Sequence, residues 1–209
     1  TTITISPPAA ITLGQSVSVT ATVAVTAPGS GTPSGTITIS DGGATAGDTC
    51  TITLPATSCS LTPGAAGNQT LTATYAGDSS FTSSSASGSL AVGVRPTAIT
   101  LTSSPNPSHV GELVSLTATV TLLPVTRSAS DAGLTQAGDG VKVAAVPTGS
   151  VTFSDGATVL GTVPLDANGV ATLAIWTLTQ GAHTLSARYS GDASAAVATV
   201  TAAQQVDQA

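Results

Sequence analysis

The chain has 209 residues and a formal net charge of −6, with only four Lys and Arg residues. Four scattered cations cannot form the basic cluster that holds a phosphate backbone, so nucleic acid and anionic membrane surfaces are not expected as partners. Ser and Thr together number 64, with 22 Gly and 12 Pro, a composition that favours strands and turns over helices. No apolar run approaches the ~20 residues that cross a bilayer, so membrane insertion is not expected.

A strand-like segment opens the chain: Thr1, Thr2, Ile3, Thr4 and Ile5. Apolar residues then alternate with Ser or Thr in residues 17–23, 36–40 and 70–75. A period of two with one apolar face is the pattern of a half-buried strand. Asp-Gly and Gly-Asp dipeptides interrupt the runs at short intervals, as turns do. The first half of the chain therefore predicts a set of short antiparallel strands.

Three segments of the first half recur in the second. Residues 14–23, 33–42 and 70–78 return as 111–120, 147–156 and 184–192. The offset is 97 for the first segment and 114 for the others, so the second copy holds 17 more residues (114 minus 97), within 121–146. A unit present twice indicates two domains. We predict an all-β chain with domains 1–95 and 96–209, each a sandwich of about seven antiparallel strands.

The joint between the predicted domains is short. Pro96 has its φ fixed at about −65° and favours an extended conformation for Arg95 before it. A short, extended joint predicts two sandwiches that lie end to end.

One motif occurs in both halves: Pro-Thr/Ser-Gly-x-Val/Ile-Thr-x-Ser-Asp-Gly, followed by a hairpin and by Thr-Leu-x-Ala-x-Tyr-x-Gly-Asp. With the Ser-Pro-Asn-Pro-Ser sequence at 104–108, it resembles the bacterial immunoglobulin-like repeats of large secreted and cell-surface proteins. The resemblance covers nearly the whole chain. It implies an immunoglobulin-like fold, a role as spacer, stalk or adhesin segment, and no fixed active site. The insertion departs from that family.

Cys50 and Cys59 are expected to form a disulfide. The ungapped repeat alignment sets them against Pro164 and Leu173, and between those two lies Asn168-Gly169, the sequence of a two-residue type I′ turn. That hairpin register, transferred to the first copy, places the two cysteines directly opposite each other. Opposed Cβ atoms lie about 4.5–5.5 Å apart, which a disulfide can bridge. A redox-active pair and half of a metal site are the alternatives, and the spacing suits neither.

Enzymatic chemistry is not expected. The two histidines are His109, beside Glu112, and His183, whose counterpart in the first copy is Gln69. A position that holds Gln in one copy is predicted to be a solvent-facing strand residue in the other. The chain contains neither Gly-x-Ser-x-Gly nor His-Glu-x-x-His. No catalytic residue is assigned.

Calcium is the one cofactor that the sequence leaves open. Asp41, Asp78, Asp155 and Asp192 all lie beside Gly in turns that repeat between the copies. Such turns, gathered at one end of a domain, could hold Ca²⁺. Each Asp also suits a turn in which its carboxylate binds the local backbone, and the bidentate Glu of a full calcium loop is absent. No metal ligand is assigned.

The insertion is a candidate partner-binding loop for a surface protein or a glycan. Its charged residues are Arg127, Asp131, Asp139 and Lys142. The alternative is a tolerated surface loop, because long insertions cost little loop entropy. Trp176, the sole tryptophan, is expected to pack in a core or an interface, with a sugar-stacking platform as the alternative.

Three functions follow from these observations, all of them extracellular. The first is a non-catalytic structural module, the stalk, spacer or adhesin segment of a bacterial surface protein, whose partners are sibling domains. The second is the subunit of a self-assembling filament or pilus, in which residues 1–5 are donated to an identical subunit. The last strand, around residues 196–203, is rich in small residues and would leave an edge open for that donation. The third is a carbohydrate-binding module of a secreted enzyme, for which five aromatic residues are few.

Overall fold

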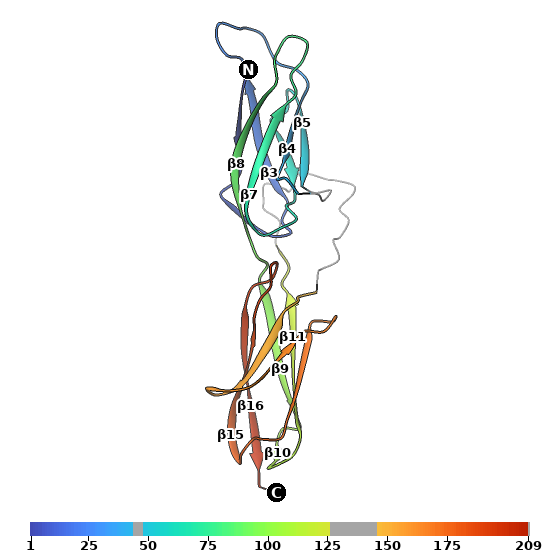
Figure 1. Ribbon diagram of the computed structural model, residues 1–209, viewed down its shortest axis with the longest axis vertical. Helices are drawn as coiled ribbons and strands as arrows, with labels where there is room; N and C mark the ends of the chain where they lie inside the picture. The colour runs from blue at the N-terminus through green and yellow to red at the C-terminus, as the bar shows by residue number, and fades with distance from the viewer. Residues whose placement is uncertain (44–47, 126–145, 209) are drawn as a thin grey trace. The chain divides into compact units, whose positions relative to one another are not determined.

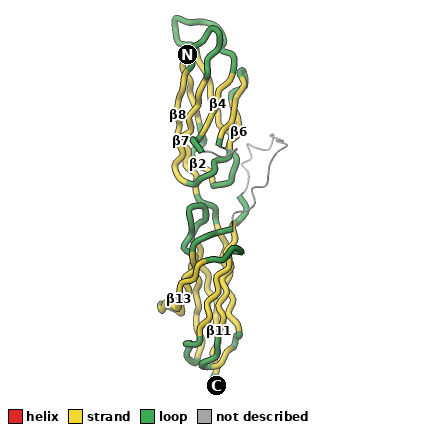
Figure 2. Tube along the Cα trace, turned by 45° about the vertical axis from the view of Figure 1, so that its right-hand side comes forward, coloured by secondary structure: helices red, strands yellow, loops and turns green. Residues whose placement is uncertain are grey.

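The computed structural model describes residues 1–43, 48–125 and 146–208, and the regular elements in those ranges are all β-strands (Figures 1 and 2). The chain divides into two compact units. The first contains Thr1–Val94, and the second begins with Arg95–Pro124 and continues after the insertion. The all-β fold class and the two tandem domains are thus confirmed.

Domain 1 consists of a three-stranded and a five-stranded sheet packed face to face. Their strand orders are β1-β3-β6 and β2-β8-β7-β4-β5. The strands are β1 (Thr2–Ser6), β2 (Ala10–Thr12), β3 (Val17–Ala24), β4 (Thr36–Ser40), β5 (Thr49–Thr53), β6 (Ser58–Leu61), β7 (Gly67–Tyr75) and β8 (Ser84–Gly93).

Domain 2 repeats this topology. Its sheets have the orders β9-β11-β14 and β10-β16-β15-β12-β13. The strands are β9 (Thr97–Ser104), β10 (Ser108–His109), β11 (Val114–Leu122), β12 (Ser150–Asp155), β13 (Thr158–Pro164), β14 (Val170–Ile175), β15 (Gly181–Tyr189) and β16 (Ala198–Asp207).

The described part of each domain has eight strands, where the sequence predicts about seven, because the first strand is divided between the two sheets. Pro7 and Pro8 separate β1 from β2, and Pro105 and Pro107 lie between β9 and β10. Proline has no N–H to give to a ladder, so the chain leaves one sheet at the prolines and joins the other after them.

The first and last strands of each domain run parallel. β2 pairs with β8 through Ala10 to Ala91 and Thr12 to Gly93, and β10 pairs with β16 through Ser108 to Val206. The other pairs of strands in the described part of the chain are antiparallel. Because the entering and leaving strands point the same way, the chain enters each sandwich at one end and leaves it at the other.

Each domain has its own core, formed by the apolar face of the period-two pattern. The largest fully buried side chains of domain 1 include Tyr75 and Ile37, and those of domain 2 include Tyr189 and Phe153. The outward face of the five-stranded sheet of domain 1 carries hydroxyls, with exposed threonines on three adjacent strands: Thr36, Thr38, Thr49, Thr51, Thr53, Thr70, Thr72 and Thr74. Alternation therefore fixes both the cores and a weakly charged surface.

Arg95 belongs structurally to domain 2. Its N–H donates to the carbonyl of Ser194, and its carbonyl accepts from the N–H of Ala196. The predicted domains divide after Arg95, and the compact units divide one residue earlier, after Val94. Among residues 1–43, 48–125 and 146–208, no helix is long and apolar enough to cross a membrane.

Candidate functional site

The repeated Tyr-x-Gly-Asp motif forms a clasp that closes one end of each sandwich. In domain 1 the clasp consists of Tyr75, Asp78 and Ser34. The Tyr75 hydroxyl donates to the carbonyl of Ser34 (2.8 Å), and the N–H and hydroxyl of Ser34 both donate to Oδ2 of Asp78 (2.8 Å each). The N–H groups of Ser80 and Phe81 donate to Oδ1. Four donors thus face one carboxylate, and they hold the pKa of Asp78 well below its usual range, the Ser34 N–H most strongly.

Domain 2 builds the same clasp from Tyr189, Asp192 and Thr148. The Tyr189 hydroxyl donates to the carbonyl of Thr148 (2.6 Å), whose own N–H and hydroxyl donate to Asp192 Oδ2 (2.8 Å each). Burial of Asp192 opposes ionisation, but the hydrogen bonds from Thr148 and Ser194 outweigh it and lower the pKa. Burial, together with the charge of Asp192, raises the pKa of Tyr189 to about 12. In each domain the clasp joins two segments that lie more than 40 residues apart in the sequence.

Glycine is required inside the clasp. Gly77 has φ +89°, and a Cβ there would lie 2.7 Å from the carbonyl oxygen of Phe81. In domain 2, Gly191 has φ +75°, and a Cβ would lie 3.0 Å from the carbonyl oxygen of Ala195. Both the left-handed backbone and the close approach exclude a side chain.

The two repeated aspartates of each domain do not gather at one end of it, which is the arrangement that a shared calcium site would need. Asp41 follows the end of β4 and Asp78 follows the end of β7, and these two strands are antiparallel, so the two turns lie at opposite ends. Asp155 and Asp192 are separated in the same way, because β12 and β15 are antiparallel. Among the described residues, no group of three or more His, Cys, Asp or Glu is placed to hold a metal ion. Calcium stays a prediction without a site.

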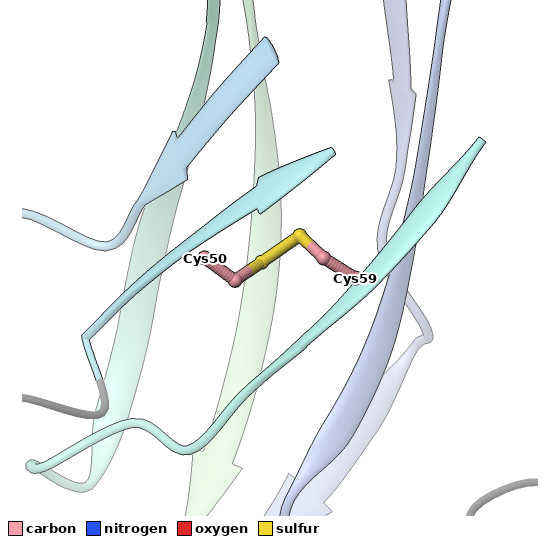
Figure 3. The surroundings of a disulfide bond; sticks show 2 residues. All are labelled: Cys50 and Cys59. Carbon is pink, nitrogen blue, oxygen red and sulfur yellow. A yellow bond between two sulfur atoms is a disulfide. The ribbon is translucent and has the colours of Figure 1, made fainter. Parts of the chain in front are cut away.

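Cys50 and Cys59 form a disulfide with a Cα–Cα distance of 5.9 Å (Figure 3). The predicted geometry is wrong, because the two cysteines do not lie on paired strands. Cys50 is on β5 and faces Ile39 of β4, whereas Cys59 is on β6 and faces Val19 of β3. The bond therefore joins the edge strand of the five-stranded sheet to the edge strand of the three-stranded sheet.

The hairpin from which that geometry was transferred is also absent. β13 pairs with β12 and β14 pairs with β11, so Asn168 and Gly169 lie in a connection between sheets. A type I′ turn needs positive φ at both central residues, and only Gly169 has it. Asp166 shapes the connection instead, because its carboxylate accepts the N–H groups of Asn168 and Val170.

Domain 2 fills the position of the disulfide with a packing contact. Phe153, the counterpart of Ile39, pairs with Gly161, and Leu116, the counterpart of Val19, pairs with Leu173. Gly161, and not Pro164, is thus the structural equivalent of Cys50. A Cβ built on Gly161 would lie 3.1 Å from the Leu173 side chain. In domain 1 the disulfide joins the two sheets at this position. In domain 2 the side chain of Leu173 packs over Gly161 instead.

The Pro-Asn-Pro-Ser turn binds the last strand of domain 2. The side chain of Asn106 donates to the carbonyl of Ala203 and accepts from the N–H of Gln205. Gln204, 1% exposed, donates to the carbonyl of Pro105 and to the hydroxyl of Ser108, which is 0% exposed. Within residues 1–43, 48–125 and 146–208, the amide oxygen of Gln204 has no hydrogen-bond partner.

This buried polar pair occupies apolar positions of the sister domain. Ser108 faces Val206 as Ile11 faces Val92, and Gln204 matches Leu90, which is 0% exposed. The sequence pattern alone did not predict this pair, although comparing the two copies position by position exposes it.

His183 is not the solvent-facing residue that the sequence predicts. Its side chain is 11% exposed. Nδ1 lies 2.6 Å from Oδ2 of Asp155, and Nε2 lies 2.7 Å from the carbonyl oxygen of Thr179. The prediction failed because Gln69 is also turned inward and uses its amide in the same way, donating to the carbonyl of Ala65.

The candidate strand-donor segment is paired within its own domain. Thr2 to Ser6 form β1, which pairs with β3 over five residue pairs, and Ile3 is 7% exposed. The last strand, β16, pairs with β15 over nine residue pairs and with β10 over two, and strand donation to its remaining edge stays a prediction. Backbone pairing there does not depend on the size of the side chains.

The candidate partner-binding residues Arg127, Asp131, Asp139 and Lys142 lie outside the described residues. Trp176 is 63% exposed, so it is not a core residue, and its position in an interface stays a prediction. The apolar face of β14 consists of Ala171, Leu173 and Ile175, and Trp176 follows on the opposite face.

Two sandwiches with this strand order, a first strand shared between the sheets and parallel first and last strands define the immunoglobulin-like fold class. The bacterial Ig-like domain (group 3) family matches residues 3–95 and again residues 101–207. The chain belongs to this family, and each of its two domains is one copy of the family's domain.

Several solved structures are similar to the chain. The fibronectin(III)-like modules of CbhA from Clostridium thermocellum are 19% identical, with 99% of this chain and 94% of that chain covered and a TM-score of 0.38. The D0-D1 domains of intimin are 15% identical, with 97% of each chain covered and a TM-score of 0.32. The Escherichia coli adhesin FdeC is 18% identical, with 98% of this chain and 64% of that chain covered and a TM-score of 0.35. A comparison with curated protein sequences finds no match.

Proposed function

We propose that the chain is a non-catalytic spacer segment of an extracellular bacterial surface protein, a piece of a stalk or adhesin. The observation that carries this proposal is the parallel pairing of first and last strands in both domains. A domain entered at one end and left at the other adds its full length to the chain. The ten residues of β8 correspond to a length of about 33 Å at about 3.3 Å per residue.

The use of the reactive side chains supports the same function. The carboxylates of Asp78 and Asp192 accept several hydrogen bonds each, both nitrogens of His183 face acceptors, and the two cysteines are bonded to each other. These side chains, which could otherwise serve as base, nucleophile or metal ligand, thus take part in contacts within their own domains. A disulfide also suits an oxidising location outside the cytoplasm.

Force spectroscopy on the intact chain, held at its two ends, tests the spacer function. Pulling loads the parallel pairs β2–β8 and β10–β16 in shear, so their hydrogen bonds must break together. We expect two unfolding events, one for each domain, at forces well above those of a control chain pulled through two cysteines introduced at one end of domain 1. Equal forces in the two geometries would contradict a load-bearing spacer.

A further inference from the structure

The ring of His183 lies between two groups that can only accept hydrogen bonds. The carbonyl oxygen of Thr179 has no hydrogen, so Nε2 at 2.7 Å must carry one. The ionised carboxylate of Asp155 likewise only accepts, so Nδ1 at 2.6 Å must also carry one. Both contacts are satisfied together only when the ring is the imidazolium ion.

We infer that protonated His183 is a latch that fixes the loop between β14 and β15 to the end of β12 in domain 2. Thr179 lies in that loop, residues 176–180, and Asp155 ends β12. A neutral imidazole has a single N–H, so loss of the proton leaves one of the two acceptors without its donor. The latch then holds the loop or the strand end, but not both.

The sister domain provides a version of this contact that does not titrate. Gln69, the counterpart of His183, donates its side-chain amide to the carbonyl of Ala65, the counterpart of Thr179, at 3.2 Å. Asp41, the counterpart of Asp155, accepts the N–H of Gly43 instead. Domain 1 thus closes the same loop with an amide, and the dependence on pH is specific to domain 2.

Few charged groups act on the ring. β12 contributes Asp155, β16 places Gln204 opposite His183, and residues 176–182 contain no titratable side chain. The Thr179 carbonyl raises the pKa of His183, burial opposes it, and Asp155 raises it further, with a net increase above the usual 6.5. For a group whose pKa is raised on folding, the stabilisation is complete below the unfolded value and is lost as the pH rises through the folded value. The latch therefore opens as the pH rises through this raised pKa.

An NMR titration of the intact chain tests this inference. We expect the His183 ring to titrate above pH 6.5, about the value of the free side chain. The loop amides of residues 177–180 and the fluorescence of Trp176 should change with the same midpoint. Hydrogen exchange of these amides should accelerate above that midpoint.

Two variants separate the latch from a general effect of pH. His183→Gln, which introduces the residue that domain 1 has at this position, keeps the contact with Thr179 and should abolish the pH-dependent step in the loop while the strands of domain 2 stay folded. Asp155→Asn should lower the midpoint of His183. Titration of His183 at or below the usual value, or a loop midpoint unchanged in His183→Gln, would overturn the inference.

Discussion

A single carboxylate organises one end of each domain, and its effect on stability depends on pH. Asp192 accepts hydrogen bonds from Thr148, Ser194 and the N–H of Ala195. Its pKa is lowered on folding, so its contribution is present above the unfolded value of about 3.9 and is lost as the pH falls through the lower folded value. Asp78 behaves in the same way in domain 1. Acid below pH ~4 is therefore expected to weaken the clasp at the end of both sandwiches.

Asp192→Asn should lower the free energy of unfolding of domain 2 by about 1 kcal/mol, because an amide nitrogen replaces an oxygen that accepts N–H donors. In this variant the free energy of unfolding of domain 2 should also fall less steeply as the pH is lowered from 4. Thermal melts across that range measure both effects. Asp207→Asn, at an exposed position near the end of β16, is the matched control and should leave the melting temperature unchanged.

Gln204 and Ser108 form a buried polar pair at positions where domain 1 has apolar side chains, so their effect on stability is best tested by replacing them together. Gln204→Leu alone leaves the Ser108 hydroxyl buried without its partner and should cost about 1–3 kcal/mol. Adding Ser108→Ile, to restore the pair Leu90 and Ile11 of the sister domain, should recover that loss. A denaturant double-mutant cycle measures the coupling. Additive effects of the two substitutions would show that the residues do not interact.

At the scale of elements, the disulfide closes the gap between the free edges of the two sheets. Replacing Cys50 and Cys59 by Ala should cost domain 1 about 2.5–3 kcal/mol, the loop-entropy value for a ten-residue ring. Because Gly161 and Leu173 occupy the equivalent positions, Gly161→Cys with Leu173→Cys should form a second disulfide in domain 2. Mass spectrometry under non-reducing conditions detects it. Pro164→Cys with Leu173→Cys, the pair that the ungapped alignment favours, is the control and should stay reduced.

The N-terminal strand leads to a prediction that separates a structural element from a donor strand. Deleting residues 1–5 removes most of β1 and the buried side chain of Ile3, whose burial contributes about 1.5–3 kcal/mol. Domain 1 should then unfold at a lower temperature while domain 2 is unaffected. A chain that keeps its stability but loses the ability to form fibres would instead support strand donation between subunits.

At the scale of the whole molecule, two separate cores predict two separate folding units. The chain divided between Val94 and Arg95 should give two fragments that each fold, with melting temperatures close to those in the intact chain. A second-domain fragment that begins at Thr97 should melt lower than one that begins at Arg95, because it lacks the backbone bonds to Ser194 and Ala196. Circular dichroism melts of the fragments provide the comparison. The end-to-end arrangement of the domains stays a prediction.

The sequence by itself determined the class of fold, the duplication and the cores. A period of two assigns side chains to opposite faces without reference to the rest of the chain, so residues such as Ile37, Leu71 and Val151 could be placed inside from local pattern alone. Because the unit occurs twice, each motif of one copy could be compared with the aligned residues of the other. The disulfide between Cys50 and Cys59 was correctly expected, although the hairpin register from which it was argued is not present.

Only the tertiary structure decided which strands are neighbours. A turn sequence such as Asn168-Gly169 constrains a few dihedral angles, whereas the choice between a hairpin and a crossing between sheets depends on which partner strand buries the following apolar face. The inward turn of His183 and the clasp around Asp192 likewise need partners more than 20 residues away in the sequence. Such contacts bring together segments that no local pattern relates, so they appear only when the sheets pack.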